Sequence, residues 1–333
     1  MLEDGASVGI EYRGAGSRID RRKGEPSMKI SMIGAGRVGS TTLYTLLLEG
    51  GIQEMAIVDI DVPRAEGEAL DLRHALALVQ NCKIYSGDYD ATEGSDMVII
   101  TAGIPRKPGD TRLDLLRRNT ELMDGILSGV LKYNKDCFIL MVSNPVDVLT
   151  YQALKKSGFP ANKVFGLGTT LDTNRFRSLL GERLGVSPDQ VVAYMLGEHG
   201  DSMVPVLSSA TVAGVPLKKY PTYSDDWIDE VVTATRFGGA EVIKRKGGTF
   251  YSVAPSIASV VRAWRNDQKK ILPISSLLNG EYLGLSGMTI GLPCVVGRNG
   301  REAIINPLLD AKEEAEFRNS FKVLKEAADS VGL

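Results

Sequence analysis

The chain has few cysteines, little net charge and no long apolar run. Its three cysteines, Cys82, Cys137 and Cys294, are far apart and form no Cys-x-x-Cys pair, which argues against a disulfide framework or a zinc site and favours a reducing cytoplasm. Lys and Arg number 39 against 41 Asp and Glu, so a net charge of -2 provides no long-range attraction for nucleic acid or an anionic membrane. The sequence also lacks the run of about 18 apolar residues needed to cross a bilayer.

Length and composition favour a globular protein of two domains. Hydrophobic residues make up 43% of the 333 residues and charged residues 24%, which are ordinary values for a globular enzyme. Residues 1–27 have neither the apolar core of a signal peptide nor the acid-poor composition of a transit peptide. We therefore predict a disordered N-terminal extension over 1–27, a nucleotide-binding domain over 28–165 and a substrate domain over 166–333.

From Met28 onward, short apolar strands alternate with helices. Such alternation is typical of a parallel sheet covered on both faces, so we predict an α/β fold of the doubly wound Rossmann type. The strands of this sheet are expected at 29–33, 55–59, 83–85, 97–101 and 138–142. After residue 165 the alternation loosens, which predicts an α+β substrate domain. Its helices are expected near 171–184, 225–246, 250–265 and 312–330, and its mixed or antiparallel strands near 191–196, 206–212 and 291–297.

A glycine-rich turn follows the first expected strand. Gly34-Ala35-Gly36-Arg37-Val38-Gly39 matches G-x-G-x-x-G, in which the glycines allow a tight turn, a close approach of pyrophosphate and close packing of helix on strand. Asp59 lies 20 residues after Gly39, at the end of the second strand. A carboxylate there binds the ribose hydroxyls and repels the extra phosphate of NADP. The pattern predicts an NAD site.

The chain contains only two histidines. His199 lies between glycines in Gly197-Glu198-His199-Gly200-Asp201-Ser202, directly after an apolar strand. An open imidazole that titrates near neutrality suits proton transfer to a carbonyl oxygen while hydride reaches its carbon. His74 lies within an expected helix, and we expect it to pack at a helix interface.

Arginines provide candidates for anion binding. Asp172 and Arg175 are three residues apart and so share one helix face, where Asp172 could orient His199 and Arg175 could grip a carboxylate. A surface ion pair is the alternative. The loop at 103–112, rich in Gly and Pro, carries Arg106 and Arg112 and has the composition of either a mobile lid or a solvated basic loop.

Taken together, these segments resemble the lactate/malate dehydrogenase family from Lys29 almost to the C-terminus. The resemblance rests on five motifs in order: Gly34 to Gly39, Thr101-Ala102-Gly103, Ser143-Asn144-Pro145-Val146-Asp147, Leu171 to Arg175, and Gly197 to Ser202. It implies NAD as the cofactor, no metal, and an assembly of two or four identical chains. The cofactor-binding residues that it implies are Gly34, Ala35, Gly36, Arg37, Val38, Gly39, Asp59, Thr101, Ala102, Gly103, Asn119, Val142 and Asn144.

The resemblance also implies catalytic and substrate-binding roles. His199 is expected to donate and accept the proton, with Asp172 as its partner, and Arg112 to polarise the reacting carbonyl. The expected substrate-binding residues are Arg106, Arg112, Asn144, Arg175 and Thr249. A catalytically silent NAD-binding protein is disfavoured, because it would be expected to lose the acid/base pair or an arginine.

The choice between malate and lactate depends on the expected lid. Six residues before Arg112, lactate enzymes of the family carry glutamine and malate enzymes arginine, and this chain has Arg106. A second guanidinium suits a second carboxylate. Leu167, where lactate enzymes usually have serine, points the same way. We therefore expect an NAD-dependent malate dehydrogenase of the tricarboxylic acid cycle, which binds malate or oxaloacetate. We expect it to be a homodimer or homotetramer in the cytoplasm. We expect it to bind neither nucleic acid nor a membrane. The alternative is a lactate or broad-specificity 2-hydroxyacid dehydrogenase.

Overall fold

The computed structural model describes residues 28–105, 109 and 111–333. The expected N-terminal extension and Arg106 therefore lie outside the described residues. The first half of the described chain alternates strands and helices: β1 (Lys29–Ile33), α1 (Arg37–Glu49), β2 (Glu54–Val58), α2 (Val62–His74), β3 (Lys83–Ser86), β4 (Met97–Ile100), α3 (Arg112–Tyr133), β5 (Phe138–Met141), α4 (Val146–Ser157) and β6 (Val164–Gly166).

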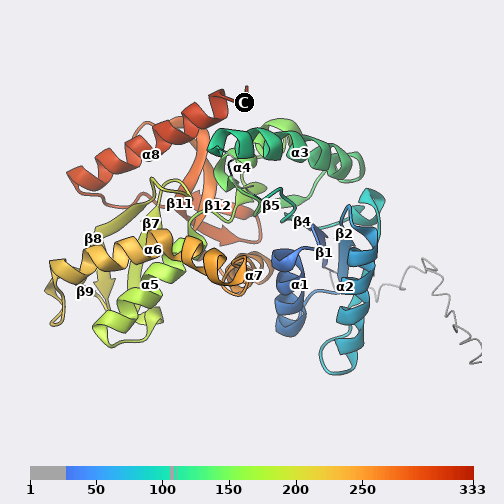
Figure 1. Ribbon diagram of the computed structural model, residues 1–333, viewed down its shortest axis with the longest axis horizontal. Helices are drawn as coiled ribbons and strands as arrows, with labels where there is room; N and C mark the ends of the chain where they lie inside the picture. Colours follow the sequence, from blue (N-terminus) through green and yellow to red (C-terminus); the bar gives the residue numbers. More distant parts are fainter. Residues whose placement is uncertain (1–27, 106–108, 110) are drawn as a thin grey trace, which may run out of the picture.

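Strands β1 to β6 form a parallel sheet in the order β6-β5-β4-β1-β2-β3. Four consecutive residues of β1, β2 and β4 are buried, because helices cover both faces of the sheet. Figure 1 shows this half of the molecule with α1 and α2 beside β1 and β2. The prediction of a doubly wound Rossmann sheet is confirmed. In such sheets ligands bind outside the carboxyl ends of the strands where the strand order reverses, here between β1 and β4.

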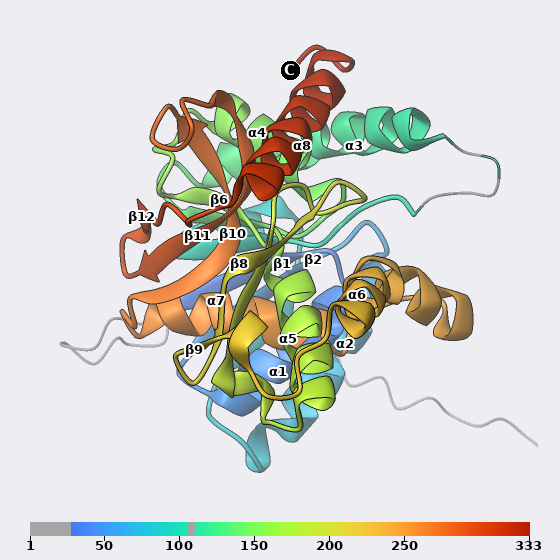
Figure 2. The same ribbon diagram turned by 90° about the vertical axis from the view of Figure 1, so that its left-hand side faces the viewer.

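The second half adds a separate sheet and extends the first one. Its elements are α5 (Thr170–Leu184), β7 (Val191–Leu196), β8 (Val204–Val212), β9 (Val215–Pro216), α6 (Asp225–Lys246), α7 (Val253–Arg265), β10 (Lys270–Asn279), β11 (Ser286–Gly297), β12 (Gly300–Ile304) and α8 (Ala311–Asp329). Strands β7, β8 and β9 form a small antiparallel sheet. Strands β10, β11 and β12 are antiparallel to one another and join the parallel sheet where Ser275 pairs with Gly166 of β6 (Figure 2).

The extension of the sheet by β10 was not expected from the sequence. Its interior contains Pro273 and the polar residues Ser275 and Ser276, which weaken the apolar signal of a buried strand. Strand β11 is also longer than the expected segment near 291–297, because Ser286 and Gly287 at its start give little strand signal in the sequence. Helix α4, which begins directly after Pro145, is a further element that the sequence patterns did not indicate.

Helix packing places His74 differently from the prediction. The buried residues of α2 are Ala65, Ala69 and Leu72, and His74 ends the helix in an exposed position. Two residues correspond to about 200° around a helix, so His74 faces away from the side on which Leu72 packs. The expectation that His74 packs at a helix interface is therefore wrong.

Helix α7 connects the two halves of the molecule. It packs against α1 of the first half and against α5 and β11 of the second, and Figure 1 shows α1 and α7 side by side. Ten of its thirteen residues are buried. Nevertheless, within the part of the chain that the structure describes, every helix is too short or too polar to cross a bilayer.

Candidate active site

The glycine-rich turn connects β1 to α1. A Cβ atom on Gly34, whose φ is 109°, would lie 2.7 Å from the backbone N of Ala102, and one on Gly39 would lie 1.9 Å from the Gly34 carbonyl oxygen. By contrast, a Cβ on Gly36 would meet nothing within 4 Å, and no side chain caps α1 at this residue. Close packing thus requires two of the glycines, and the third leaves open space at the positive end of a helix. That arrangement fits a pyrophosphate group.

Asp59 lies just beyond β2, beside this turn. Its Oδ2 accepts a hydrogen bond from the backbone N–H of Ala35 at 2.6 Å, and its Oδ1 accepts one from the N–H of Asp61 at 2.9 Å. The carboxylate is half-buried. The geometry therefore places a negative charge at the end of β2, where the ribose of a dinucleotide lies in Rossmann sheets.

The loop after β4 closes the opposite side of the turn. The hydroxyl of Thr101 donates to the carbonyl of Gly34 at 3.0 Å. Asn119, buried on α3, accepts from the N–H of Ile104 at 2.8 Å and donates to the carbonyl of the same residue at 3.1 Å. The Asn119 amide thus holds the loop that carries Ala102 and Gly103 through its backbone.

Replacing Asp59 with Ser is expected to reduce the preference for NADH over NADPH by about tenfold or more, which corresponds to about 1.4 kcal/mol. The substitution removes the charge that repels a 2′-phosphate and leaves an oxygen that can accept from Ala35. The measurement is the ratio of kcat/KM for the two cofactors. Asp61→Ser is the matched control, because it removes a carboxylate two residues away and keeps an N-cap for α2. An unchanged ratio in Asp59→Ser would remove Asp59 from cofactor selection.

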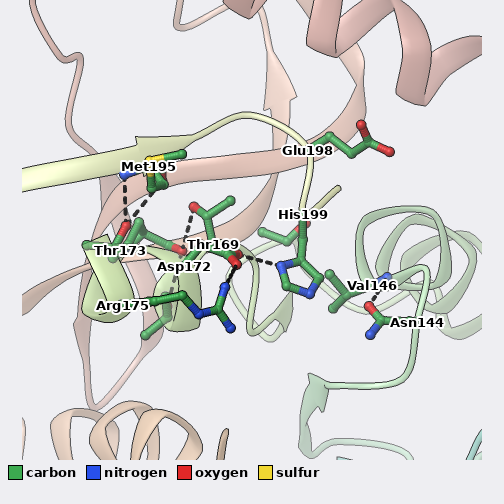
Figure 3. Close-up of polar contacts among 12 residues, drawn as sticks. Asn144, Val146, Thr169, Asp172, Thr173, Arg175, Met195, Glu198 and His199 are labelled. Carbon is green, nitrogen blue, oxygen red and sulfur yellow. Dashed lines mark hydrogen bonds and ion pairs between the residues drawn. The ribbon is translucent and has the colours of Figure 1, made fainter. Parts of the chain in front are cut away.

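A buried Asp–His–Arg cluster lies where α5 meets the loop after β7. The Nδ1 atom of His199 lies 2.5 Å from Oδ2 of Asp172, and Oδ1 of Asp172 accepts from Nη1 of Arg175 at 3.1 Å (Figure 3). The Asp172 side chain is 2% exposed and that of His199 is 24% exposed. Because Asp172 occupies Nδ1, the other ring nitrogen of His199, Nε2, is available for proton exchange.

The charges in this cluster favour a protonated imidazole. Burial alone would lower the pKa of His199, but the charge and hydrogen bond of Asp172, together with the charge of Asp147, raise it to about 9. Burial alone would raise the pKa of Asp172, but His199 and Arg175 hold it below its ordinary value. A His that carries its proton beside an Asp carboxylate can act as a general acid in the reduction of a ketone.

Arg175 is held rigidly before any substrate binds. Its Nη1 also donates to the carbonyl of Thr235 at 3.0 Å, and its side chain is 19% exposed. The absence of a side chain at Gly238 makes room for it, because a Cβ there would lie 2.7 Å from Cδ of Arg175. A guanidinium fixed in this way can bind a carboxylate with little further loss of conformational entropy.

A cavity of about 190 Å³ adjoins His199. Among the residues predicted for the site, those that line it are Val38, Val142, Asn144, His199 and Thr249. The lining residues that were not predicted as site residues are Val146, Leu167, Gly168, Leu171 and Val253. Two of these five, Val146 and Leu171, are within the motifs that carry the family resemblance, so their position in the sequence is a signal that could have identified them.

The two remaining arginines of the expected lid are placed differently. Arg112 is the first residue of α3, is 64% exposed and forms an ion pair with Asp201, two residues after His199. It does not line the cavity in this structure. Arg106 lies outside the described residues. Arg37 is instead connected to the substrate side, since its Nη1 donates to the carbonyl of Lys246 at 3.2 Å, close to Thr249 in the sequence.

Among the residues that the structure describes, His, Cys, Asp and Glu side chains form no group of three that could hold a metal ion.

The Rossmann sheet, its glycine-rich turn and the Asp172–His199 pair define a nicotinamide-dependent dehydrogenase. Two family models match the chain, the lactate/malate dehydrogenase NAD binding domain over residues 28–166 and the lactate/malate dehydrogenase alpha/beta C-terminal domain over residues 169–332. The chain therefore belongs to the lactate/malate dehydrogenase family. It is an NAD-dependent oxidoreductase that acts on a 2-hydroxy acid.

Similar proteins include L-lactate dehydrogenases from two bacteria. The L-lactate dehydrogenase of Acetivibrio thermocellus is 45% identical over 310 residues, which cover 92% of this chain and 98% of that protein. The L-lactate dehydrogenase of Clostridium botulinum is 42% identical over 302 residues, covering 89% and 95%. The crystal structure of a minor L-lactate dehydrogenase from Enterococcus mundtii superposes with a TM-score of 0.89 at 38% identity, covering 92% of this chain and 99% of the other.

These similarities overturn the expectation of a malate dehydrogenase of the tricarboxylic acid cycle that binds malate or oxaloacetate. That expectation rested on Arg106 and Leu167, but relatives that share 42–45% of their residues over most of the chain are L-lactate dehydrogenases. The error has a physical reason, since the expectation was drawn from residue type alone. A guanidinium selects a substrate with a second carboxylate only if the closed site holds the guanidinium against that carboxylate and excludes water from the pair. Residue type alone does not reveal whether the site does so.

Proposed function

We propose that this protein interconverts L-lactate and pyruvate, with NAD and NADH as cofactors. The similarity to L-lactate dehydrogenases over about nine-tenths of the chain carries the proposal. The cavity supports it, because the described residues that line it include no Lys or Arg. Six of them are aliphatic, namely Val38, Val142, Val146, Leu167, Leu171 and Val253, and the others are Asn144, Gly168, His199 and Thr249. Such a wall suits the methyl group of pyruvate, which is stabilised by leaving water.

The proposed reaction uses three groups of the cluster. When bound, NADH supplies a hydride for the carbonyl carbon of pyruvate. His199 gives its Nε2 proton to the carbonyl oxygen, and Asp172 keeps the ring oriented through Nδ1. Arg175 binds the carboxylate of the substrate through its free N–H groups. In the oxidation of lactate, His199 takes the hydroxyl proton back, and the Asp172 carboxylate stabilises the imidazolium that forms.

Two further residues complete the proposed site. Asn144, beyond the His199 ring from Asp172 in Figure 3, is within the cavity wall and is proposed to contact the substrate oxygen and the nicotinamide. Arg112 is proposed to polarise the carbonyl. Since its guanidinium pairs with Asp201 here, this role requires that the ion pair exchange for a contact with substrate.

Steady-state reduction of pyruvate and oxaloacetate with NADH tests the substrate assignment. We expect kcat/KM for pyruvate to exceed that for oxaloacetate by about tenfold or more, equivalent to about 1.4 kcal/mol of preferential transition-state binding. A series of 2-oxo acids with longer aliphatic chains distinguishes a narrow lactate enzyme from the broad-specificity alternative. A preference for oxaloacetate would overturn the proposal.

We also propose a homodimer or homotetramer, a division between the two domains at residues 165 and 166, and a cytoplasmic location. The cysteines support a reducing compartment, since Cys82, Cys137 and Cys294 are all buried and unpaired. Burial raises the pKa of each thiol to about 12, which keeps it protonated and unreactive.

A further inference from the structure

A second buried carboxylate, that of Asp147, lies against His199 and has no part in the reaction described above. Asp147 is in the first turn of α4 and is 2% exposed. Its Oδ2 accepts from the backbone N–H of His199 at 2.8 Å, and its Oδ1 accepts from the hydroxyl of Ser275 on β10 at 2.6 Å. Its backbone carbonyl accepts from the hydroxyl of Thr289 on β11 at 2.5 Å. Asp147 thus attaches the loop of His199 to the rigid centre of the extended sheet.

We propose that Asp147 is a positioning residue for proton transfer, which holds the peptide of His199 in place and stabilises the protonated imidazole with its negative charge. The proposal deepens the role proposed for His199 and rests on it. Asp172 contacts the ring directly, whereas Asp147 acts through the backbone and through space.

Helix capping does not account for this carboxylate. Pro145 is the N-cap of α4 and no side chain caps the helix, while both oxygens of Asp147 are bonded to other parts of the fold. Neither donor requires a charge, because an Asn could accept from His199 and donate to the rotatable hydroxyl of Ser275. Burying a charged carboxylate costs more free energy than burying a neutral amide that would make the same hydrogen bonds. The negative charge of Asp147 therefore indicates a role beyond hydrogen bonding.

The charged groups around the imidazole have opposing effects. Asp172 and Asp147 favour its protonation, and Arg175 opposes it. Glu198, next to His199 on the loop, is held by hydrogen bonds to Ser202 and points away from Asp172 in Figure 3. Strands β10 and β11 direct only uncharged hydroxyls at Asp147.

The ionisation of Asp147 precedes that of His199 as the pH rises. Burial raises the pKa of Asp147 to about 6, although hydrogen bonds from Ser275 and His199 act against the rise. The pKa of His199 is about 9. Asp147 is therefore already negative over the range in which His199 loses its proton, and removing that charge must lower the pH at which the proton is lost.

Nuclear magnetic resonance of isotope-labelled histidine in the full, untagged chain tests the proposal directly. The chain has only two histidines, and exposed His74 serves as the internal reference. We expect Asp147→Asn to lower the midpoint of the His199 titration by about one pH unit or more, because a negative charge that favours the protonated imidazole is removed, and to leave the His74 resonance unaffected. The alkaline limb of kcat/KM for pyruvate should move by the same amount.

Ser276→Ala is the matched control. Ser276 follows Ser275 on β10, and its side chain points to the opposite face of the sheet, so the His199 midpoint should stay at the parental value. A folded Asp147→Asn with an unchanged His199 midpoint would overturn the proposal and leave Asp147 with a structural role only. The titration needs no turnover, so a failure of the pyruvate assignment would not affect its outcome.

A second measurement applies if Asp147→Asn does not fold. In the parent, the His199 resonance should show a smaller inflection near pH 6, where Asp147 ionises. Ser275→Ala removes a donor to the carboxylate and should move this inflection to higher pH, whereas Ser276→Ala should not. An inflection that is absent, or that is unmoved by Ser275→Ala, would contradict the coupling.

Discussion

Replacing His199 with Asn is expected to lower kcat for pyruvate reduction by a factor on the order of 10²–10⁴, the usual contribution of a general acid or base. An amide has no proton to give at the pH of the assay, while its size and polarity fit the same position. Because the glycine-rich turn and Asp59 lie on other elements, binding of NADH should persist. Steady-state kinetics measure the first effect, and a fluorescence titration with NADH measures the second.

The other histidine provides the control. His74 is exposed at the end of α2, so His74→Asn should retain the parental kcat within about twofold. If His199→Asn also kept near-normal turnover, another group would have to supply the proton. If it lost NADH binding as well, the substitution would have disturbed the fold rather than the proton transfer.

Replacing Arg175 with Lys is expected to lower kcat/KM for pyruvate by a factor of roughly 10²–10³, equivalent to about 3–4 kcal/mol. An ammonium keeps the positive charge but cannot grip a carboxylate with two parallel N–H groups. It also cannot retain the contacts to Asp172 and to the Thr235 carbonyl while it binds the substrate. The measurement is kcat/KM for pyruvate at saturating NADH.

Arg177→Lys separates recognition from stability. Arg177 is on the same helix, but its Nε donates to the carbonyl of Ala193 at 2.8 Å and its guanidinium lies 4.9 Å from the ring centroid of Tyr194. That substitution should change the melting temperature more than kcat/KM. If Arg175→Lys changed kcat/KM no more than Arg177→Lys does, the carboxylate clamp would have to be another residue.

Local signals in the sequence accounted for the Rossmann half of the fold. The expected strand at 29–33 coincides with β1, and the expected strand at 97–101 differs from β4 by one residue at its end. Apolar runs and capping residues act within a few positions of the chain, so a single sequence reveals them. Strand β10 was missed because the contact of Ser275 with Gly166 joins residues more than 100 positions apart.

The sequence by itself determined the residue types of the site and the order of the motifs that carry them. Only the tertiary structure decided how the charges are arranged. Asp147, Asp172 and His199 come from α4, α5 and the loop after β7, and the packing of these elements places one buried carboxylate on the imidazole of His199 and a second on its backbone N–H. Specificity was misjudged for the same reason. A carboxylate or a guanidinium has an effect only through its distance, its burial and its partners, and these are properties of the folded chain rather than of any one position.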